Sequence, residues 1–142
     1  MPAVQATLAQ AAELRPRSGP HVSTLAGARV LVLGAGGAAR AVVHAAQNLG
    51  AEVTVAGRSA GPAAALAGEL GCCQVAWEKL QEQVYDVLVN TTPIGSAALN
   101  PGETPMPPQW LRTGTIVLDA VYRPIKTALL GAAHARGCTA VP

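Results

Sequence analysis

The sequence predicts an α/β fold in which a doubly wound, parallel sheet of six strands, in the order 3-2-1-4-5-6, lies between helices. Two observations predict it. Short β-branched runs, several of them apolar on both faces as buried parallel strands are, alternate with helical stretches of about ten residues. Glycines follow the helical stretches, where a helix end favours a left-handed residue. A strand, a helix and a second parallel strand form a right-handed crossover, and repeated crossovers build such a sheet.

Six short runs are the predicted strands. They are residues 29–33, 52–56, 73–76, 86–89, 115–118 and 138–141. Three stretches between them place apolar side chains on one helical stripe, at residues 37–49, 62–70 and 125–136. Gly50, Gly71 and Gly137 stand where these three helices are expected to end.

The link over residues 90–112 is long and rich in Pro and Gly. We expect it to form a loop with one short helix at about residues 108–111. A loop of this length inside a compact α/β domain is usually functional.

The N-terminal part lacks the regular alternation of strand and helix patterns found in the rest of the chain. Residues 3–14 have a short helical pattern, which residues 15–20 (RPRSGP) interrupt with two prolines and a glycine. We therefore expect residues 1–25 to be a helix and linker outside the core, and residues 26–142 to form one cofactor-binding domain.

Composition excludes several classes of partner. The net charge of +2 comes from scattered basic residues, and only Trp77, Trp110, Tyr85 and Tyr122 are aromatic, so we expect no nucleic-acid binding. No run approaches about 18 apolar residues, so we expect no membrane span. Arg15 and Arg17 leave an organellar transit peptide, plastid or other, open as an alternative to a cytoplasmic protein.

The three cysteines also limit the chemistry. Cys72, Cys73 and Cys138 form no CxxC pair and are odd in number, which argues against a zinc site and a disulfide framework. We predict no metal and a reducing, cytoplasm-like compartment.

A glycine-rich turn follows the first strand. Gly34-Ala35-Gly36-Gly37-Ala38-Ala39 matches G-x-G-x-x-(G/A), the phosphate-binding turn of Rossmann-type domains. Gly34 permits the tight turn, Gly36 lets a pyrophosphate approach the backbone, and Ala39 lets the helix lie close to the sheet. Free N–H groups at the helix start would then hold the phosphates. The alternative is an ordinary glycine-rich turn, which the flanking strands and helix disfavour.

The end of the second strand indicates which dinucleotide is preferred. An NAD-preferring site would have an acid there for the ribose 2′-hydroxyl, but this chain has Gly57-Arg58-Ser59. Arg58 can pair with a 2′-phosphate and stack on adenine, and Ser59 adds a hydroxyl and a backbone donor. Glu52, the nearest acid, starts the strand and so lies at the wrong end. These residues predict NADP, unless Arg58 is merely a solvated turn residue.

Four motifs occur in one order along the chain: GAGGAAR at the first turn, GRS after the second strand, DVLVNTTPIG at residues 86–95, and DAVYRP at residues 119–124 followed by KTALL. Together they resemble the shikimate dehydrogenase family over residues 26–141. The ETPMP and DAVYRP segments resemble the forms fused to a dehydroquinate dehydratase. The resemblance implies reversible NADPH-dependent reduction of 3-dehydroshikimate to shikimate, a step of aromatic amino-acid biosynthesis.

The resemblance also implies roles for residues that follow the fourth and fifth strands. Asn90, Thr91 and Thr92 would border the nicotinamide, Ala120 would pack on its ring, and Tyr122 would direct its hydroxyl toward shikimate. The alternatives are a polar turn that satisfies strand-end backbone groups and an ordinary half-buried tyrosine. We expect Asp119 to bond nearby backbone.

The chain also departs from the family. Gly57 replaces the usual Asn, and Gly61-Pro62 stands where a second basic residue often follows, so NADP affinity is expected to be modest. Neither of the two lysines lies in a domain that carries the family's catalytic Lys–Asp pair, and the Gly-x-x-Met-Leu segment with its Gln-bearing helix is not seen. We therefore expect no catalytic residue here, and a nearly inactive cofactor-binding fragment.

Two other classes stay open. The glutamyl-tRNA and methylenetetrahydrofolate types of two-domain dehydrogenase share the glycine-rich turn, but neither accounts as well for DAVYRP. A non-catalytic nucleotide-binding or regulatory module would need no partner domain. Quinate as an alternative substrate and the oligomeric state are left open by the residues alone.

Overall fold

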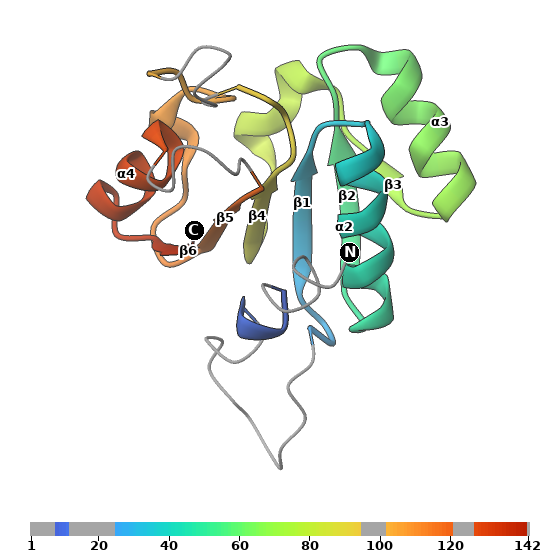
Figure 1. Cartoon of the computed structure of the whole chain (residues 1–142), viewed down its shortest axis with the longest axis horizontal. Helices are drawn as coiled ribbons and strands as arrows, with labels where there is room; N and C mark the ends of the chain where they lie inside the picture. Colours follow the sequence, from blue (N-terminus) through green and yellow to red (C-terminus); the bar gives the residue numbers. More distant parts are fainter. Residues whose placement is uncertain (1–7, 12–24, 95–101, 121–126, 142) are drawn as a thin grey trace.

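The computed structural model describes residues 8–11, 25–94, 102–120 and 127–141 (Figure 1). Beyond one helical turn at residues 8–11, the elements run β1 (Arg29–Leu33), α2 (Gly37–Asn48), β2 (Glu52–Ala56), α3 (Ala60–Leu70), β3 (Cys73–Gln74), η1 (Trp77–Glu82), β4 (Val87–Asn90), η2 (Pro108–Trp110), β5 (Ile116–Asp119), α4 (Ala128–Ala135) and β6 (Thr139–Val141), where η denotes a 3-10 helix.

The six strands form one parallel sheet in the order β3-β2-β1-β4-β5-β6, which confirms the predicted order. The chain steps outward from β1 in one direction through β2 and β3, and then returns to lie beside β1 as β4. This reversal between β1 and β4 is the topological switch point, outside whose carboxyl ends ligands bind in open α/β sheets.

Two buried clusters cover the two faces of the sheet. Val30 and Val32 of β1 face a cluster with α2 and α3, while Leu31 and Leu33 face a second cluster with η1, η2 and α4. Figure 1 shows α2 and α3 over the β1–β3 half and α4 beside β5 and β6. Every residue of β4 and β5 is buried, as expected for strands covered on both faces.

The predicted helix ends are confirmed. Gly50, Gly71 and Gly137 have φ angles of 87°, 66° and 79°, the left-handed conformation that a closing helix favours.

The starts of two helices differ from the prediction. α3 begins at Ala60 rather than at residue 62, because Pro62 lies in the first turn, where its missing N–H has no intrahelical acceptor to lose. α4 begins at Ala128 rather than at residue 125, because Thr127 is extended and its side chain accepts a hydrogen bond from Leu130 N as the N-cap.

The third strand is shorter than predicted, and the 3-10 helix after it was not predicted. β3 ends at Gln74, since Trp77 and Leu80 turn toward the second cluster at a spacing of three residues, where 3-10 side chains share one side. The expectation that the N-terminal segment lies outside the core was wrong at the described residues, because Leu8 and Ala11 are buried against the first cluster.

Strands β4 and β5 each extend one residue past the predicted end. Asn90 and Asp119 are therefore strand residues, and they are direct partners across the two strands. This register places their two polar side chains at the carboxyl end of the sheet, next to the switch point.

Candidate dinucleotide-binding site

The glycine-rich turn leaves β1 at the switch point. Gly34 has a φ angle of 115°, and its N–H donates to Ala56 O at 2.8 Å, which joins the turn to the end of β2. A Cβ added to Gly34 would collide with Thr91 Oγ1. Gly34 is therefore required both for the turn and for the close approach of the segment that follows β4.

The next glycines leave space open. A Cβ added to Gly36 or Gly37 would meet no heavy atom within 4 Å, and Gly36 has an ordinary φ angle of −93°. Neither the φ angle nor steric contact within 4 Å therefore requires glycine at Gly36. Ala39 is fully buried, so α2 lies close to the sheet, as predicted.

The N-terminus of α2 is suited to an anion. Gly36 is its N-cap without a side-chain hydrogen bond, and the first turn has no acidic residue. The first N–H groups of a helix have no partner within the helix, and its dipole places partial positive charge at this end. A phosphate approaching over Gly36 and Gly37 would meet these donors.

Arg58 follows β2 at the same edge of the sheet. Its side chain is exposed, its Nη2 lies 3.5 Å from Pro105 O, and its Cζ lies 5.4 Å from the centre of the Trp77 ring. Within the described residues it makes no ion pair, so its charge is available to a ligand. Glu52 begins β2 at the opposite edge, as predicted.

Ser59 and Gly57 flank this arginine. Ser59 is exposed at the N-cap of α3, and its hydroxyl makes no capping hydrogen bond. A Cβ added to Gly57 would lie 3.3 Å from Ala63 Cβ and 3.5 Å from Ala35 Cβ. A larger residue at this position would press on α3 and the phosphate turn, which approach the backbone closely.

Asn90 is fully buried and uses both ends of its amide. Its Oδ1 accepts from Thr92 N at 3.0 Å and from Thr92 Oγ1 at 2.7 Å, and its Nδ2 donates to Asp119 Oδ1 at 3.1 Å. Thr91 Oγ1 donates to Leu33 O at 2.6 Å. These side chains hold the backbone after β4 in place, so they would shape a ligand site more than offer free donors to it.

Asp119 and Thr127 extend this network. Thr127 Oγ1 donates to Asp119 Oδ2 at 2.7 Å, and both residues are buried. The expectation that Asp119 bonds nearby backbone stays a prediction. Its hydrogen bonds to the side chains of Asn90 and Thr127 were not predicted, and they form because strand pairing sets Asp119 beside Asn90. We assigned no role to Thr127 from the sequence, although a threonine directly before a helical pattern is a signal for an N-cap.

Ala120 directly follows β5, beside these residues. It is exposed, and its N–H donates to Asn90 O at 2.8 Å. Tyr122 lies outside the described residues.

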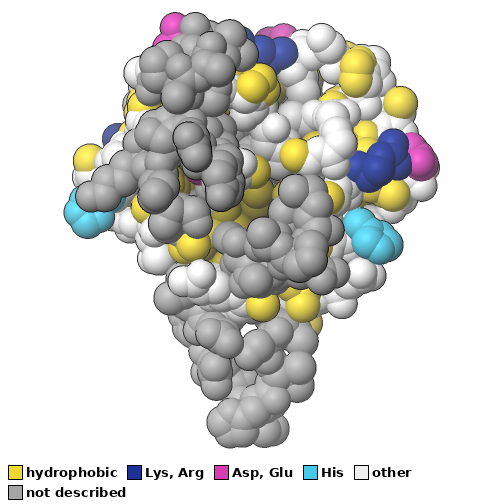
Figure 2. All heavy atoms as spheres, viewed as in Figure 1, with side chains coloured by type: hydrophobic (Ala, Val, Ile, Leu, Met, Phe, Trp, Pro, Cys, Tyr) yellow, Lys and Arg dark blue, Asp and Glu magenta, His cyan; other side chains and the backbone are white. Residues whose placement is uncertain are grey.

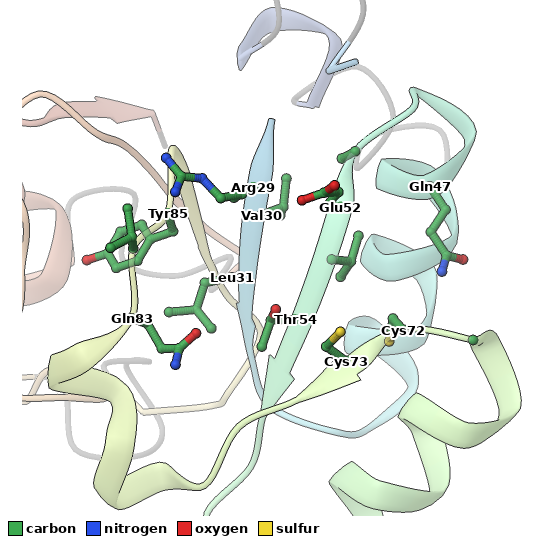
Figure 3. A pocket seen from close by; sticks show the side chains of 14 residues that line it. Arg29, Val30, Leu31, Gln47, Glu52, Thr54, Cys72, Cys73, Gln83 and Tyr85 are labelled. Atoms are coloured by element: carbon green, nitrogen blue, oxygen red, sulfur yellow. The ribbon is translucent and has the colours of Figure 1, made fainter. Parts of the chain in front are cut away.

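A groove of about 520 Å³ lies at the other end of the strands (Figure 3). Arg29, Glu52, Gln83 and Cys73 line it, at the amino-terminal starts of β1, β2 and β3 and before β4. It is separate from the Gly34 turn, which leaves the carboxyl end of β1. Burial, together with the neighbouring Cys73, raises the pKa of the Cys72 thiol, which disfavours the nucleophilic thiolate.

The surface in Figure 2 carries its basic side chains at separate points, one of them beside an acidic side chain. Among the described residues, no group of three His, Cys, Asp or Glu could hold a metal ion. None of the helices in the described part of the chain has the length and apolar character needed to cross a membrane.

The sheet order, the switch point and the glycine-rich turn before α2 place this chain in the class of Rossmann-type α/β domains. The chain belongs to the shikimate / quinate 5-dehydrogenase family, whose model matches residues 19–119. The resemblance seen in the motifs is thereby confirmed.

Individual relatives and solved structures support this family assignment. The shikimate dehydrogenase (NADP(+)) of Acidiphilium cryptum is 46% identical over 113 residues, which are 78% of this chain and 40% of that protein. The Thermus thermophilus shikimate 5-dehydrogenase, solved with NADP(H) and shikimate, has a TM-score of 0.72 and 40% identity over 79% of this chain and 41% of that one. The Corynebacterium glutamicum quinate dehydrogenase, solved with NAD, has a TM-score of 0.80 and 27% identity over 96% and 48%. The chain spans about 40% of the length of the curated relatives it matches.

Proposed function

We propose that this chain is the NADP(H)-binding domain of a shikimate dehydrogenase, and that residues 26–142 form that domain. The observation that carries the proposal is Arg58, which stands at the end of β2 with no ion-pair partner among the described residues, where an NAD-preferring site would have an acid. The proposed cofactor contacts are Gly34, Ala35, Gly36, Gly37, Ala38, Arg58, Ser59, Asn90, Thr91, Thr92 and Ala120. The proposed substrate contact is Tyr122.

The pyrophosphate would bind at the start of α2. The open space over Gly36 and Gly37 and the uncapped N–H groups support this placement. Neither feature distinguishes NADP from NAD, because both cofactors carry the same pyrophosphate.

The 2′-phosphate would bind Arg58 and Ser59. A hydrogen bond to a charged group contributes about 1.5–3 kcal/mol, which corresponds to roughly a tenfold to hundredfold preference for the phosphorylated cofactor. Because Arg58 is exposed and solvent screens its charge, we expect a value near tenfold.

The nicotinamide, which carries the hydride when bound, would lie over the carboxyl ends of β4 and β5. The Asn90–Asp119 pair fixes the backbone there, and the exposed Ala120 leaves room beside it. In the whole protein the reaction would be NADPH-dependent reduction of 3-dehydroshikimate to shikimate. We propose no catalytic residue within this chain. We place the protein in the cytoplasm, or in a plastid, which the three free thiols support.

The test is calorimetry of this chain with NADP and NAD. We expect NADP to bind about tenfold more tightly, and Arg58→Ala to abolish that ratio by weakening NADP binding more than NAD binding. Arg136→Ala is the matched control, since Arg136 is an exposed arginine at the C-terminal end of α4. Equal affinities of the two cofactors in the wild-type chain would refute the proposal.

A second candidate is an NAD-linked quinate dehydrogenase domain. Gly57 and Gly61-Pro62 leave Arg58 without a second basic residue, and the NAD-bound quinate dehydrogenase shares the fold. Tighter binding of NAD than of NADP in the same calorimetry would favour it.

A further inference from the structure

Trp77 lies beside the arginine assigned above to the 2′-phosphate. It is the first residue of η1, and the centre of its ring is 5.4 Å from Arg58 Cζ. A guanidinium within about 6 Å of an aromatic centroid is attracted by the negative face of the ring. The exposed cation of Arg58 therefore has an aromatic partner from a different part of the chain.

Trp77 is held in place by its own packing. It is half-buried and packs against the second core cluster, to which Leu80, one 3-10 turn further on, also belongs. Gln74 Nε2 donates to Ala60 O at 3.1 Å, which joins the end of β3 to the start of α3. The ring is thus fixed next to the turn that carries Arg58.

The other side-chain contact of Arg58 is also fixed. Pro105 O, 3.5 Å from Arg58 Nη2, belongs to a buried residue, and Thr104 Oγ1 donates to the neighbouring Met106 O at 2.7 Å. An exposed arginine otherwise samples many rotamers, and a ligand that binds it must restrict them. Two fixed neighbours reduce that cost.

We propose that Trp77 is a specificity-determining, positioning residue that holds Arg58 ready for the 2′-phosphate of NADP. This inference rests on the proposed function. With the indole against one face, the planar guanidinium keeps its N–H donors for the phosphate. Trp77 takes the place of the second basic residue that Gly61-Pro62 does not supply.

A purely structural role for Trp77 makes a different prediction. Apolar packing against the second cluster would be preserved largely by leucine, whereas the attraction for the guanidinium requires an aromatic face. A structural residue would also affect both cofactors alike, because NADP and NAD differ only at the 2′-phosphate.

The experiment measures the affinity of this chain for NADP and NAD by calorimetry in wild type, Trp77→Leu and Trp77→Phe. We expect Trp77→Leu to weaken NADP binding about two- to fivefold and to leave NAD unchanged, and Trp77→Phe to lie between. Trp110→Leu is the matched control, since Trp110 is half-buried against the same cluster and makes no ring contact with Arg58. It should lower the melting temperature without changing the ratio of the two affinities.

A double variant distinguishes failure of this inference from failure of the proposed function. If Arg58→Ala lowers the NADP-to-NAD ratio, Trp77→Leu should have no further effect on it in the Arg58→Ala background. If Arg58→Ala lowers the ratio and neither Trp77 variant does, or if Trp77→Leu tightens NADP binding, this inference is overturned and the proposed function stands. If Arg58→Ala leaves the ratio unchanged, the proposed function fails as well. Trp77→Phe preserves the test if Trp77→Leu does not fold.

Discussion

Thr127 Oγ1 donates a hydrogen bond of 2.7 Å to Oδ2 of Asp119 and accepts one of 3.3 Å from Leu130 N. One hydroxyl therefore caps α4 and satisfies a buried carboxylate oxygen at the end of β5. Through Asn90, the same carboxylate is joined to the segment that follows β4. The network connects three elements at the edge of the sheet where the nicotinamide is proposed to bind.

Removing this hydroxyl should destabilise the fold. Thr127→Val keeps the shape of the side chain but leaves one acceptor on Asp119 and the N–H of Leu130 without this partner. We expect a loss of about 1–3 kcal/mol in the free energy of unfolding, measured by urea denaturation. Thr127→Ser keeps the hydroxyl and should retain most of the stability. A valine variant as stable as wild type would contradict this account.

Gly36→Ala should weaken cofactor binding without changing the stability of the fold. The added methyl group meets no heavy atom within 4 Å, and the φ angle of −93° suits alanine, so the melting temperature should stay within about 2 °C of wild type. The methyl group would occupy the space proposed for the pyrophosphate, so NADP and NAD should both bind at least about tenfold more weakly. Unchanged affinities would place the pyrophosphate elsewhere.

Gly34→Ala, by contrast, should destabilise the fold itself. Its φ angle of 115° is unfavourable for alanine, and the methyl group would collide with Thr91 Oγ1. We expect a loss of about 2–4 kcal/mol in the free energy of unfolding, before any ligand is added. Thr91→Ser retains the hydroxyl that causes the collision, so it should not rescue the variant, whereas Thr91→Ala should do so in part.

The Arg40–Glu69 pair predicts a pH dependence. Arg40 Nη1 and Nη2 lie 2.5 Å and 2.7 Å from the two carboxylate oxygens of Glu69, and hydrogen bonding to Arg40 holds the pKa of Glu69 below its usual range. A carboxyl whose pKa is lowered by folding adds stability above its unfolded pKa, and that stability is lost as the pH falls through the folded value.

Glu69→Gln should therefore lower the melting temperature slightly at pH 7. The difference from wild type should shrink as the pH falls below the ordinary glutamate pKa and vanish once the pH has passed the lowered pKa of the folded state. The difference at pH 7 should also shrink in 1 M salt, because both side chains are exposed. Glu78→Gln is the matched surface control, since Glu78 makes no ion pair among the described residues, and it should leave the melting temperature at pH 7 unchanged. A difference that persisted at low pH would assign the effect to helix propensity or packing.

Local patterns in the sequence were enough to predict the architecture. The structure contains the six predicted strands and three predicted helices in the predicted order, with some bounds shifted, and the glycines at the helix ends and the glycine-rich turn before α2 lie where they were predicted. These features are local, because helix and strand periods and left-handed glycines depend on a few neighbouring residues. The four ordered motifs likewise identified the family that the comparison confirmed.

Which side chains contact one another depends on the three-dimensional fold. Asn90 reaches Asp119 because β4 and β5 extend one residue further than predicted and pair in that register, and Trp77 reaches Arg58 because the chain leaves the short β3 into a 3-10 helix. The fold likewise makes Thr127 the N-cap of α4 and places Gly57 close to Ala63 and Ala35. Such contacts join residues far apart in sequence, so they follow from strand register and helix packing, which local patterns leave undefined.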